Sequence, residues 1–410
     1  MIRINALSHR QQKFLFIFGI TVIYLALLVW FDFLNGPLWI DEKSFWPSSR
    51  TFSDDLWPTV EELTTYGSLN TPLPFIIFGG LDYLFGGEAV PGRVLNFILS
   101  LVIIGIIGWP SQAKGGRALL SLIGLFLCPY FLGLSGRLYT EMLASIWVLI
   151  GFMAYFRNRH ILSTVAFILG IASRQYMIAF PLAVASYEMF SLIQDYRLDQ
   201  RLNWGKYAHS LAPVAAIFSL GFWILLFGGL APQAAIEIKA PEVQRSLFAL
   251  VPGGIVNFLA FVGLYLVIPE FILFRPAHPL RILKANWPKY IAIAVGLLIF
   301  CLLFPPLDYG NGNLMKVGKL IPIPWLHGLM FYSLALLACL RFSKPDLFFW
   351  LVLFNALIMI KAWPWDRYVL PLAIVFWYMK SINYPHLVAS YPVSRSQSYL
   401  SEQGSKGEGG

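Results

Sequence analysis

Several charged residues stand at the ends of long apolar segments, where a charge is costly unless it is paired or hydrated. The acidic pair Asp41 and Glu42 follows the first apolar segment, and single arginines, Arg174 and Arg367, stand between later ones. A carboxylate can take the proton of an attacking hydroxyl group. The planar fork of an arginine matches the oxygens of a phosphate. This combination favours transfer of a group from a phosphate-linked donor to a hydroxyl, with Asp41 as the base and both arginines holding the phosphate.

Each of these residues also has a plainer interpretation. Asp41 and Glu42 are equally compatible with the start of a hydrated loop. Arg137 and Glu141 are four residues apart, the spacing of a structural ion pair on a helix. Asp366 and Arg367 lie beside two tryptophans, a pattern that is also typical of an anchor at a membrane interface.

The elements that position these residues are predicted to be membrane helices. The chain has 410 residues, of which 58% are hydrophobic and 12% charged, and a water-soluble fold of this size cannot hide so much apolar surface. Apolar stretches of about 17 to 25 residues, the length that spans a bilayer, recur along the chain. The sequence therefore predicts an all-α polytopic membrane protein. Twelve crossings are expected, at 14–33, 90–109, 117–136, 139–156, 161–173, 178–193, 207–230, 246–273, 289–304, 323–340, 345–361 and 368–383.

Lysines and arginines gather in every second loop, which predicts that these loops and both termini face the cytoplasm. The alternation requires 161–193 to be a hairpin that turns at Arg174, so that the candidate residues share the extracytoplasmic side. The basic groups are Arg3, Arg10 and Lys13, then Lys114 and Arg117, Arg157 and Arg159, Arg197, Arg201 and Lys206, Arg275, Arg281 and Lys284, and Arg341 and Lys344.

Residues 1–393 are predicted to form a single transmembrane domain. Its first extracytoplasmic loop is 34–89, and nine of the 21 acidic residues lie between Asp32 and Glu88. We expect a short interfacial helix at 54–63 and an apolar run at 72–85 that lies in the interface or dips into the membrane without crossing it. The tail 394–410 is rich in Ser, Gln and Gly and is predicted to be a disordered cytoplasmic segment. Membrane lipids are the expected surroundings, and no basic, aromatic-rich soluble segment predicts a nucleic-acid partner.

Five short motifs carry a resemblance to a known family. The chain resembles the GT-C superfamily of polyprenyl-phosphate-sugar-dependent glycosyltransferases, and within it the dolichyl-phosphate-glucose α-1,2-glucosyltransferases. It departs from the family pattern at Glu141, where the family has Asp, at Tyr176 and Met177, where small polar residues are usual, and near Phe45, where a histidine is absent. The motifs are Asp41-Glu42 with Phe45, Asn70-Thr71-Pro72-Leu73-Pro74 with Arg93 and Asn96, Leu138-Tyr139-Thr140-Glu141, Ser173-Arg174-Gln175, and Arg367-Tyr368-Val369-Leu370-Pro371.

The resemblance implies a GT-C-like helix bundle and an inverting hexosyltransferase. A hexose, taken to be glucose, would move from a polyprenyl-phosphate-sugar donor to a hydroxyl of a glycan or lipid-linked acceptor. Asp41 and Glu42 would be catalytic, and the donor or substrate would be bound by Arg137, Tyr139, Glu141, Arg174, Gln175, Asp366 and Arg367.

No cofactor is expected, and no metal ion, because the first loop holds one clear acidic pair. The short length and the lack of an Asn-x-Ser/Thr sequence favour a bacterial inner membrane over the endoplasmic reticulum. A membrane transporter or lipid flippase is the alternative. It would favour two matching half-repeats, which the sequence does not contain.

Overall fold

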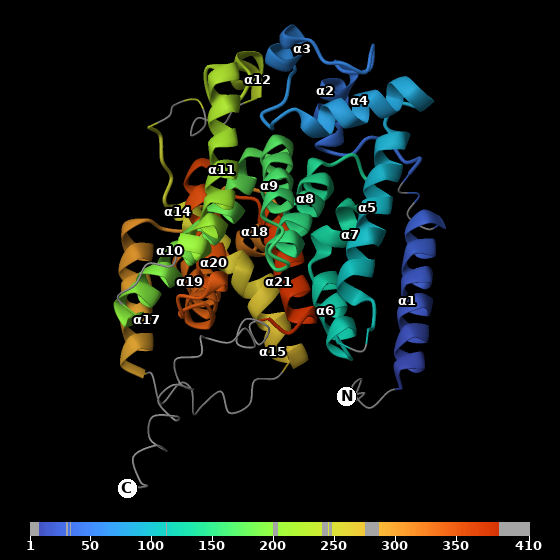
Figure 1. The fold of residues 1–410 in the computed structure, drawn as a ribbon. Coiled ribbons are helices and arrows are strands. Elements are labelled where there is room, and N and C mark those ends of the chain that lie inside the picture. The colour runs from blue at the N-terminus through green and yellow to red at the C-terminus, as the bar shows by residue number, and fades with distance from the viewer. Residues whose placement is uncertain are drawn as a thin grey trace, which may run out of the picture.

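The computed structural model describes residues 8–29, 32, 34–111, 113–199, 204–239, 245, 248–274 and 287–384. Within these ranges the regular elements are helices, and the only β-type contact is an isolated bridge between Asn311 and Trp365. The long helices form a bundle, and the short helices α2 (Glu42–Arg50), α3 (Val60–Thr65) and α4 (Leu73–Phe85) cover one end of it (Figure 1). We call this end the loop end. The predicted all-α class is confirmed for the described residues.

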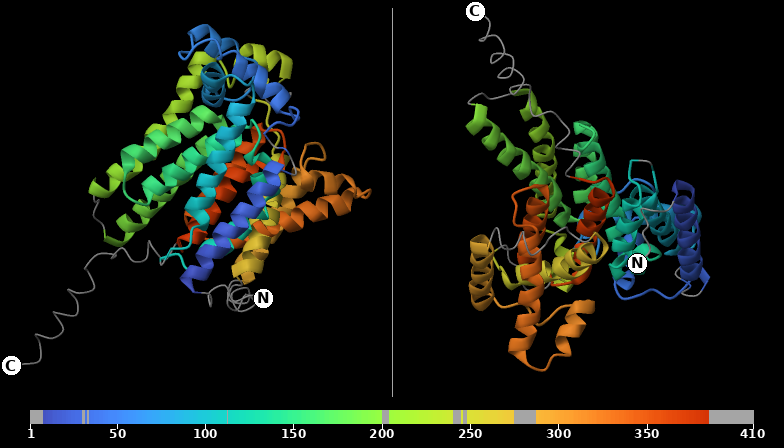
Figure 2. Two further views of the ribbon diagram at one scale, coloured as in Figure 1. Left: turned by 90° about the vertical axis from the view of Figure 1, so that its right-hand side faces the viewer. Right: turned by 90° about the horizontal axis from the view of Figure 1, so that it is seen from below.

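Four helical stretches in the described ranges are long and apolar enough to cross a membrane. They are α1 (His9–Val29), α5 (Val90–Gly108), the stretch Gln175–Arg197 and the stretch Gly253–Phe274. α1 and α17 (Trp287–Leu303) lie at opposite edges of the bundle (Figures 1 and 2). The helices are thus compatible with an integral membrane protein, while the count of twelve crossings stays a prediction.

Each predicted crossing contains at least part of a helix. The predicted tail 394–410 lies outside the described residues, as do Arg3, Arg201, Arg275, Arg281 and Lys284. The remaining helices are α6 (Arg117–Phe126), α7 (Pro129–Ser135), α8 (Thr140–Tyr155), α9 (His160–Ser173), α10 (Ala179–Asp199), α11 (Trp204–Phe227), α12 (Gln233–Lys239), α14 (Gly253–Val262), α15 (Ile268–Phe274), α17 (Trp287–Leu303), α18 (Asn313–Lys319), α19 (Pro324–Arg341), α20 (Leu347–Ile358) and α21 (Leu370–Ser381), with the short turns η2 (Gln175–Ile178), η3 (Gly263–Val267), η4 (Met359–Lys361) and η5 (Asp366–Val369).

The predicted crossing 117–136 is not one straight helix. α6 ends at Phe126, and α7 begins at Pro129 at an angle of 77° to it. Proline lacks an amide hydrogen and is tolerated best in the first turn of a helix, so Pro129 begins a new helix there. By contrast, α9 ends at Ser173 and α10 begins at Ala179, which puts the predicted break in 161–193 at Arg174.

The first loop contains helices, but the predicted helix at 54–63 is wrong in position. α3 begins at Val60 because Thr59 and Glu62 form a capping box. The amide of Glu62 donates to Thr59 Oγ1 at 3.2 Å, and the amide of Thr59 donates to the Glu62 carboxylate at 2.6 Å. α2 and α4 pack so closely that a Cβ on Gly79 would collide with the carbonyl oxygen of Ser49. The loop therefore holds α2, and with it Asp41, in a fixed place.

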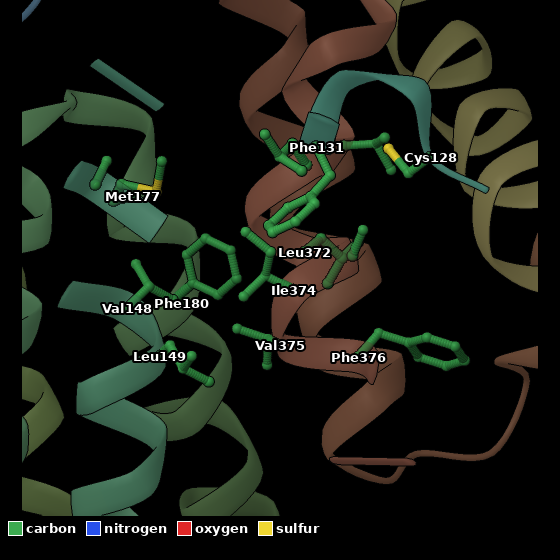
Figure 3. Packing of buried hydrophobic residues seen from close by; sticks show 14 of the residues in the cluster. Cys128, Phe131, Val148, Leu149, Met177, Phe180, Leu372, Ile374, Val375 and Phe376 are labelled. Atoms are coloured by element: carbon green, nitrogen blue, oxygen red, sulfur yellow. The ribbon is translucent and has the colours of Figure 1, made fainter. Parts of the chain in front are cut away.

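α21 lies in the centre of the bundle. Every residue from Leu370 to Met379 is buried, as expected for a helix that is apolar on all sides. It packs against α5, α6 and α8, and the ring of Trp377 lies against Gly124 of α6. Because η5 leads directly into α21, Arg367 stands on a rigid support. Figure 3 shows Ile374 and Val375 on the side of α21 that faces Val148, Leu149 and Phe180, whereas the ring of Phe376 points to the other side.

Candidate functional site

A cavity of about 630 Å³ lies between α2, the turn from α9 into η2, α11 and the segment from α20 to η5. This volume is typical of a small-molecule binding site. Most of the wall is apolar, with side chains such as Leu220, Leu230, Ile236, Leu357 and Ile360. The charged residues in the wall are Asp41, Arg174, Lys361 and Arg367.

Arg367 links the first loop to α8. Its Nη1 forms an ion pair with Oδ2 of Asp41, and its Nε lies 3.0 Å from Oε1 of Glu141. Arg174 also contacts Glu141, with Nη1 at 2.6 Å from the same Oε1, and donates to Oγ1 of Thr140 at 2.9 Å. Two arginines and two carboxylates thus form one network without net charge.

Asp41 is the most accessible member of this network. Its side chain is 19% exposed, whereas Arg367 is 5%, Arg174 3% and Glu141 0% exposed. Asp41 also makes no side-chain capping hydrogen bond to α2, although it stands at the N-cap position. Among the carboxylates predicted to be site residues, Asp41 alone lines the cavity and can contact a hydroxyl group there.

Four separate elements bring the network together. Asp41 precedes α2, Glu141 lies in the first turn of α8, Arg174 follows the last residue of α9, and Arg367 lies in η5. The positive end of the α8 dipole favours a carboxylate in its first turn, which suits Glu141. Arg174 has extended backbone angles that end α9 and precede η2.

Glu42 lies next to Asp41 but does not line the cavity. Its carboxylate is 0% exposed and accepts hydrogen bonds from Arg93 Nε and Nη2, both at 2.8 Å. It also accepts the amides of Leu138 at 2.7 Å and Trp39 at 2.8 Å. With these partners, Glu42 holds the start of α2 against α5 and the segment before α8, and its oxygens are occupied.

Arg137 and Tyr139 lie around the edge of the network. Arg137 Nη1 is 3.9 Å from Oε2 of Glu42, and its guanidinium lies 3.8 Å from the ring centre of Trp39. The Tyr139 ring is 5.3 Å from the guanidinium carbon of Arg367.

Asp366 is the centre of a separate hydrogen-bond cluster. It accepts hydrogen bonds from the Tyr130 hydroxyl, from the Tyr265 hydroxyl at 2.8 Å and from the amide of Leu314 at 3.0 Å. Burial raises the pKa of Asp366, and these hydrogen bonds oppose that shift. Gly312 has a φ of +118°, and a Cβ there would collide with Asp366. Asp366 therefore fastens η5 to α7, η3 and α18, and it does not line the cavity.

Gln175 lines the cavity, as predicted for a binding residue, but its amide group is used to join loops. Nε2 donates to the carbonyl of Leu69 at 2.7 Å and to that of Leu230 at 3.0 Å. The side chain therefore ties the first loop and the end of α11 to η2 across one wall of the cavity.

Aromatic rings hold both cavity arginines. The guanidinium carbon of Arg367 lies 3.6 Å from the ring centre of Trp365, and that of Arg174 lies 4.8 Å from the ring centre of Tyr176. Tyr176 and Tyr368 pack against each other at 5.3 Å. Cation–π contacts of this kind fix the guanidinium planes while leaving their hydrogens available to other partners.

Part of the cavity wall could not be predicted from the sequence. Its polar residues Ser44, Ser68 and Lys361 carried no recognisable signal, because isolated serines and lysines are common in any loop. Trp363 and Trp365 stood out in the sequence as interface anchors, and they line the cavity instead.

No protein-family model matches the chain, and comparisons with curated proteins and with solved structures find no match either. The assignment of a function therefore depends on the residues of the site.

Proposed function

We propose that the chain is an integral membrane glycosyltransferase of the GT-C type. It moves a hexose, glucose in the simplest case, from a polyprenyl-phosphate donor to a hydroxyl group of a glycan or lipid-linked acceptor. The main support is that Asp41, Arg174 and Arg367, which the sequence singles out for this chemistry, line one cavity.

Each of the three residues has a distinct role in this proposal. Asp41 accepts the proton of the acceptor hydroxyl, whose oxygen forms a bond to the anomeric carbon of the sugar. The bond from that carbon to the phosphate oxygen breaks, and its electron pair leaves with the polyprenyl phosphate. Arg174 and Arg367 stabilise the charge that develops on this phosphate. Attack opposite the leaving group inverts the anomeric centre.

The rest of the cavity supports the same substrate class. The apolar walls from α11, α20 and the segment at 230–236 suit an isoprenoid chain next to the charged network. In this proposal the loop end faces away from the cytoplasm, both termini face it, and the membrane is the bacterial inner membrane. A donor lipid would then reach the cavity from within the bilayer.

The experiment is transfer of radiolabelled sugar by the purified protein in detergent, from short-chain polyprenyl-phosphate glucose and, in parallel, mannose. The acceptor is a mixed pool of glycans and lipid-linked glycans. Asp41→Asn should lower turnover by about 10² to 10⁴, while the exposed Asp54→Asn, the same change in the same loop, should keep wild-type activity.

Two outcomes would contradict the proposal. Full activity of Asp41→Asn would show that Asp41 is not the base. Absence of transfer from either donor, together with lipid-dependent uptake or scrambling in proteoliposomes, would identify a transporter or flippase instead.

A further inference from the structure

Arg367 is shared between two carboxylates. Its Nη1 pairs with Asp41 and its Nε with Glu141, while the face of the guanidinium lies 3.6 Å from the ring centre of Trp365. Its side chain is only 5% exposed. A guanidinium held on one face and at these two nitrogens cannot turn to a distant ligand. Because each of its two-pronged edges includes Nη1 or Nε, a phosphate that binds Arg367 through two hydrogen bonds replaces one of the carboxylates.

Asp41 is the carboxylate that is easier to replace. Glu141 is 0% exposed and has Arg174 as a second partner at 2.6 Å. Asp41 is 19% exposed, and among the described residues Arg367 is its only ion-pair partner. Its side chain caps no helix amide. Rotation of this one partly exposed side chain is therefore enough to free Nη1 of Arg367.

The charge changes of the proposed reaction fall on the same two groups. The donor phosphodiester carries one negative charge, and the released polyprenyl monophosphate carries two when fully ionised. The acceptor proton moves to Asp41, which becomes neutral, while the electron pair of the broken carbon–oxygen bond moves to the phosphate. Asp41 loses a charge in the same step in which the phosphate gains one.

We propose that Arg367 changes partner during transfer, from the carboxylate of Asp41 to the leaving phosphate. This inference rests on the proposed function. Glu141 stays in place as the fixed counter-ion of Arg174 and Arg367, and the other ionisable groups around Arg367 are the phenols of Tyr139 and Tyr368. The partner change couples proton uptake at the base to departure of the lipid phosphate. It also means that ionised Asp41 opposes binding of the product phosphate.

The test is binding of farnesyl phosphate to the full-length protein in detergent, measured by calorimetry at pH 8. The phosphate is then dianionic, because its second pKa is about 6. Asn at position 41 imitates the neutral, protonated base. Asp41→Asn should therefore bind farnesyl phosphate roughly tenfold or more tightly than the wild type. Asp54→Asn should bind like the wild type. Equal or weaker binding by Asp41→Asn would overturn the partner change.

A double-variant comparison tests whether the tightening depends on Arg367. In the background of Arg367→Met, which removes the shared partner, the Asp41→Asn change should tighten binding much less, and equal tightening would contradict the partner change. If folded wild type and Asp41→Asn both fail to bind farnesyl phosphate, the proposed function itself is wrong. Binding without tightening contradicts the partner change alone.

Discussion

Glu42 and Arg93 form a buried ion pair with two hydrogen bonds, each 2.8 Å long. Their side chains are 0% and 3% exposed, and they connect the start of α2 to α5. Because Asp41 directly precedes Glu42, this pair determines where the proposed base stands. The two neighbouring carboxylates thus have separate tasks, one structural and one facing the cavity.

We predict that Glu42→Gln destabilises the protein. The change leaves the buried charge of Arg93 without its counter-ion, which costs about 3 to 5 kcal/mol. Thermal unfolding in detergent should show a clear loss for Glu42→Gln and almost none for Glu61→Gln, an exposed glutamate of α3. An unchanged melting temperature combined with lost transfer would instead make Glu42 catalytic.

Replacement of the cavity arginines should weaken the use of the donor. Arg174→Lys and Arg367→Lys keep the charge but lose the planar fork, and a hydrogen bond to a charged group contributes about 1.5 to 3 kcal/mol. We therefore expect kcat/KM for the donor to fall roughly tenfold to a hundredfold. Lys316→Ala is the control, because Lys316 is exposed on α18 and does not line the cavity. Similar small effects in all three variants would mean that the arginines are structural.

We predict that replacement of Asp366 lowers the stability of the protein and leaves donor binding largely unchanged. Asp366→Asn places an amide group among the hydroxyls of Tyr130 and Tyr265 and the amide of Leu314, which all donate to the native carboxylate. At least one donor is then left unsatisfied, at a cost of about 1 to 3 kcal/mol. Thermal unfolding should show this loss, and the milder Tyr265→Phe should show a smaller one. A variant with native stability and a raised KM for the donor would move Asp366 into the binding site.

The orientation of the bundle can be tested by labelling of single cysteines with a membrane-impermeant maleimide. Asp54 in the first loop and Arg157 after α8 are both exposed. Intact spheroplasts should be labelled at Asp54→Cys and not at Arg157→Cys, which should react after permeabilisation. The wild-type protein serves as the control for background labelling of Cys128, Cys301 and Cys339. The reverse pattern would place the cavity on the cytoplasmic side.

Hydrophobic patterning was sufficient to place most of the helices. Membrane-length apolar runs such as 90–109 leave few alternatives to a helix, and α5 spans Val90–Gly108. The patterning did not reveal the bend between α6 and α7, because the flanking residues are apolar on both sides of Pro129. It also did not reveal α2, which is too short and too polar to show a periodic signal.

The types of residue in the candidate site could be predicted from the sequence. The direction in which each side chain points could not. Asp41, Arg174 and Arg367 line the cavity, whereas their sequence neighbours Glu42 and Asp366 face other partners. Successive residues on a helix point about 100° apart, so neighbouring charges in a sequence need not share a site. Arg93 and Tyr130 complete the two structural clusters from distant elements, and such contacts require the tertiary fold.

The ion pair between Asp41 and Arg367 has a consequence for the order of biosynthesis. A chain is made from its N-terminus, so Glu141 can meet Arg174 as soon as α9 is complete. Asp41 has to wait for η5, which precedes the last described helix. Until then Asp41 lacks the arginine that compensates its charge, and the proposed catalytic centre is completed only after η5 has been made. A polypeptide that stops before η5 would thus lack activity even if all its earlier helices had inserted.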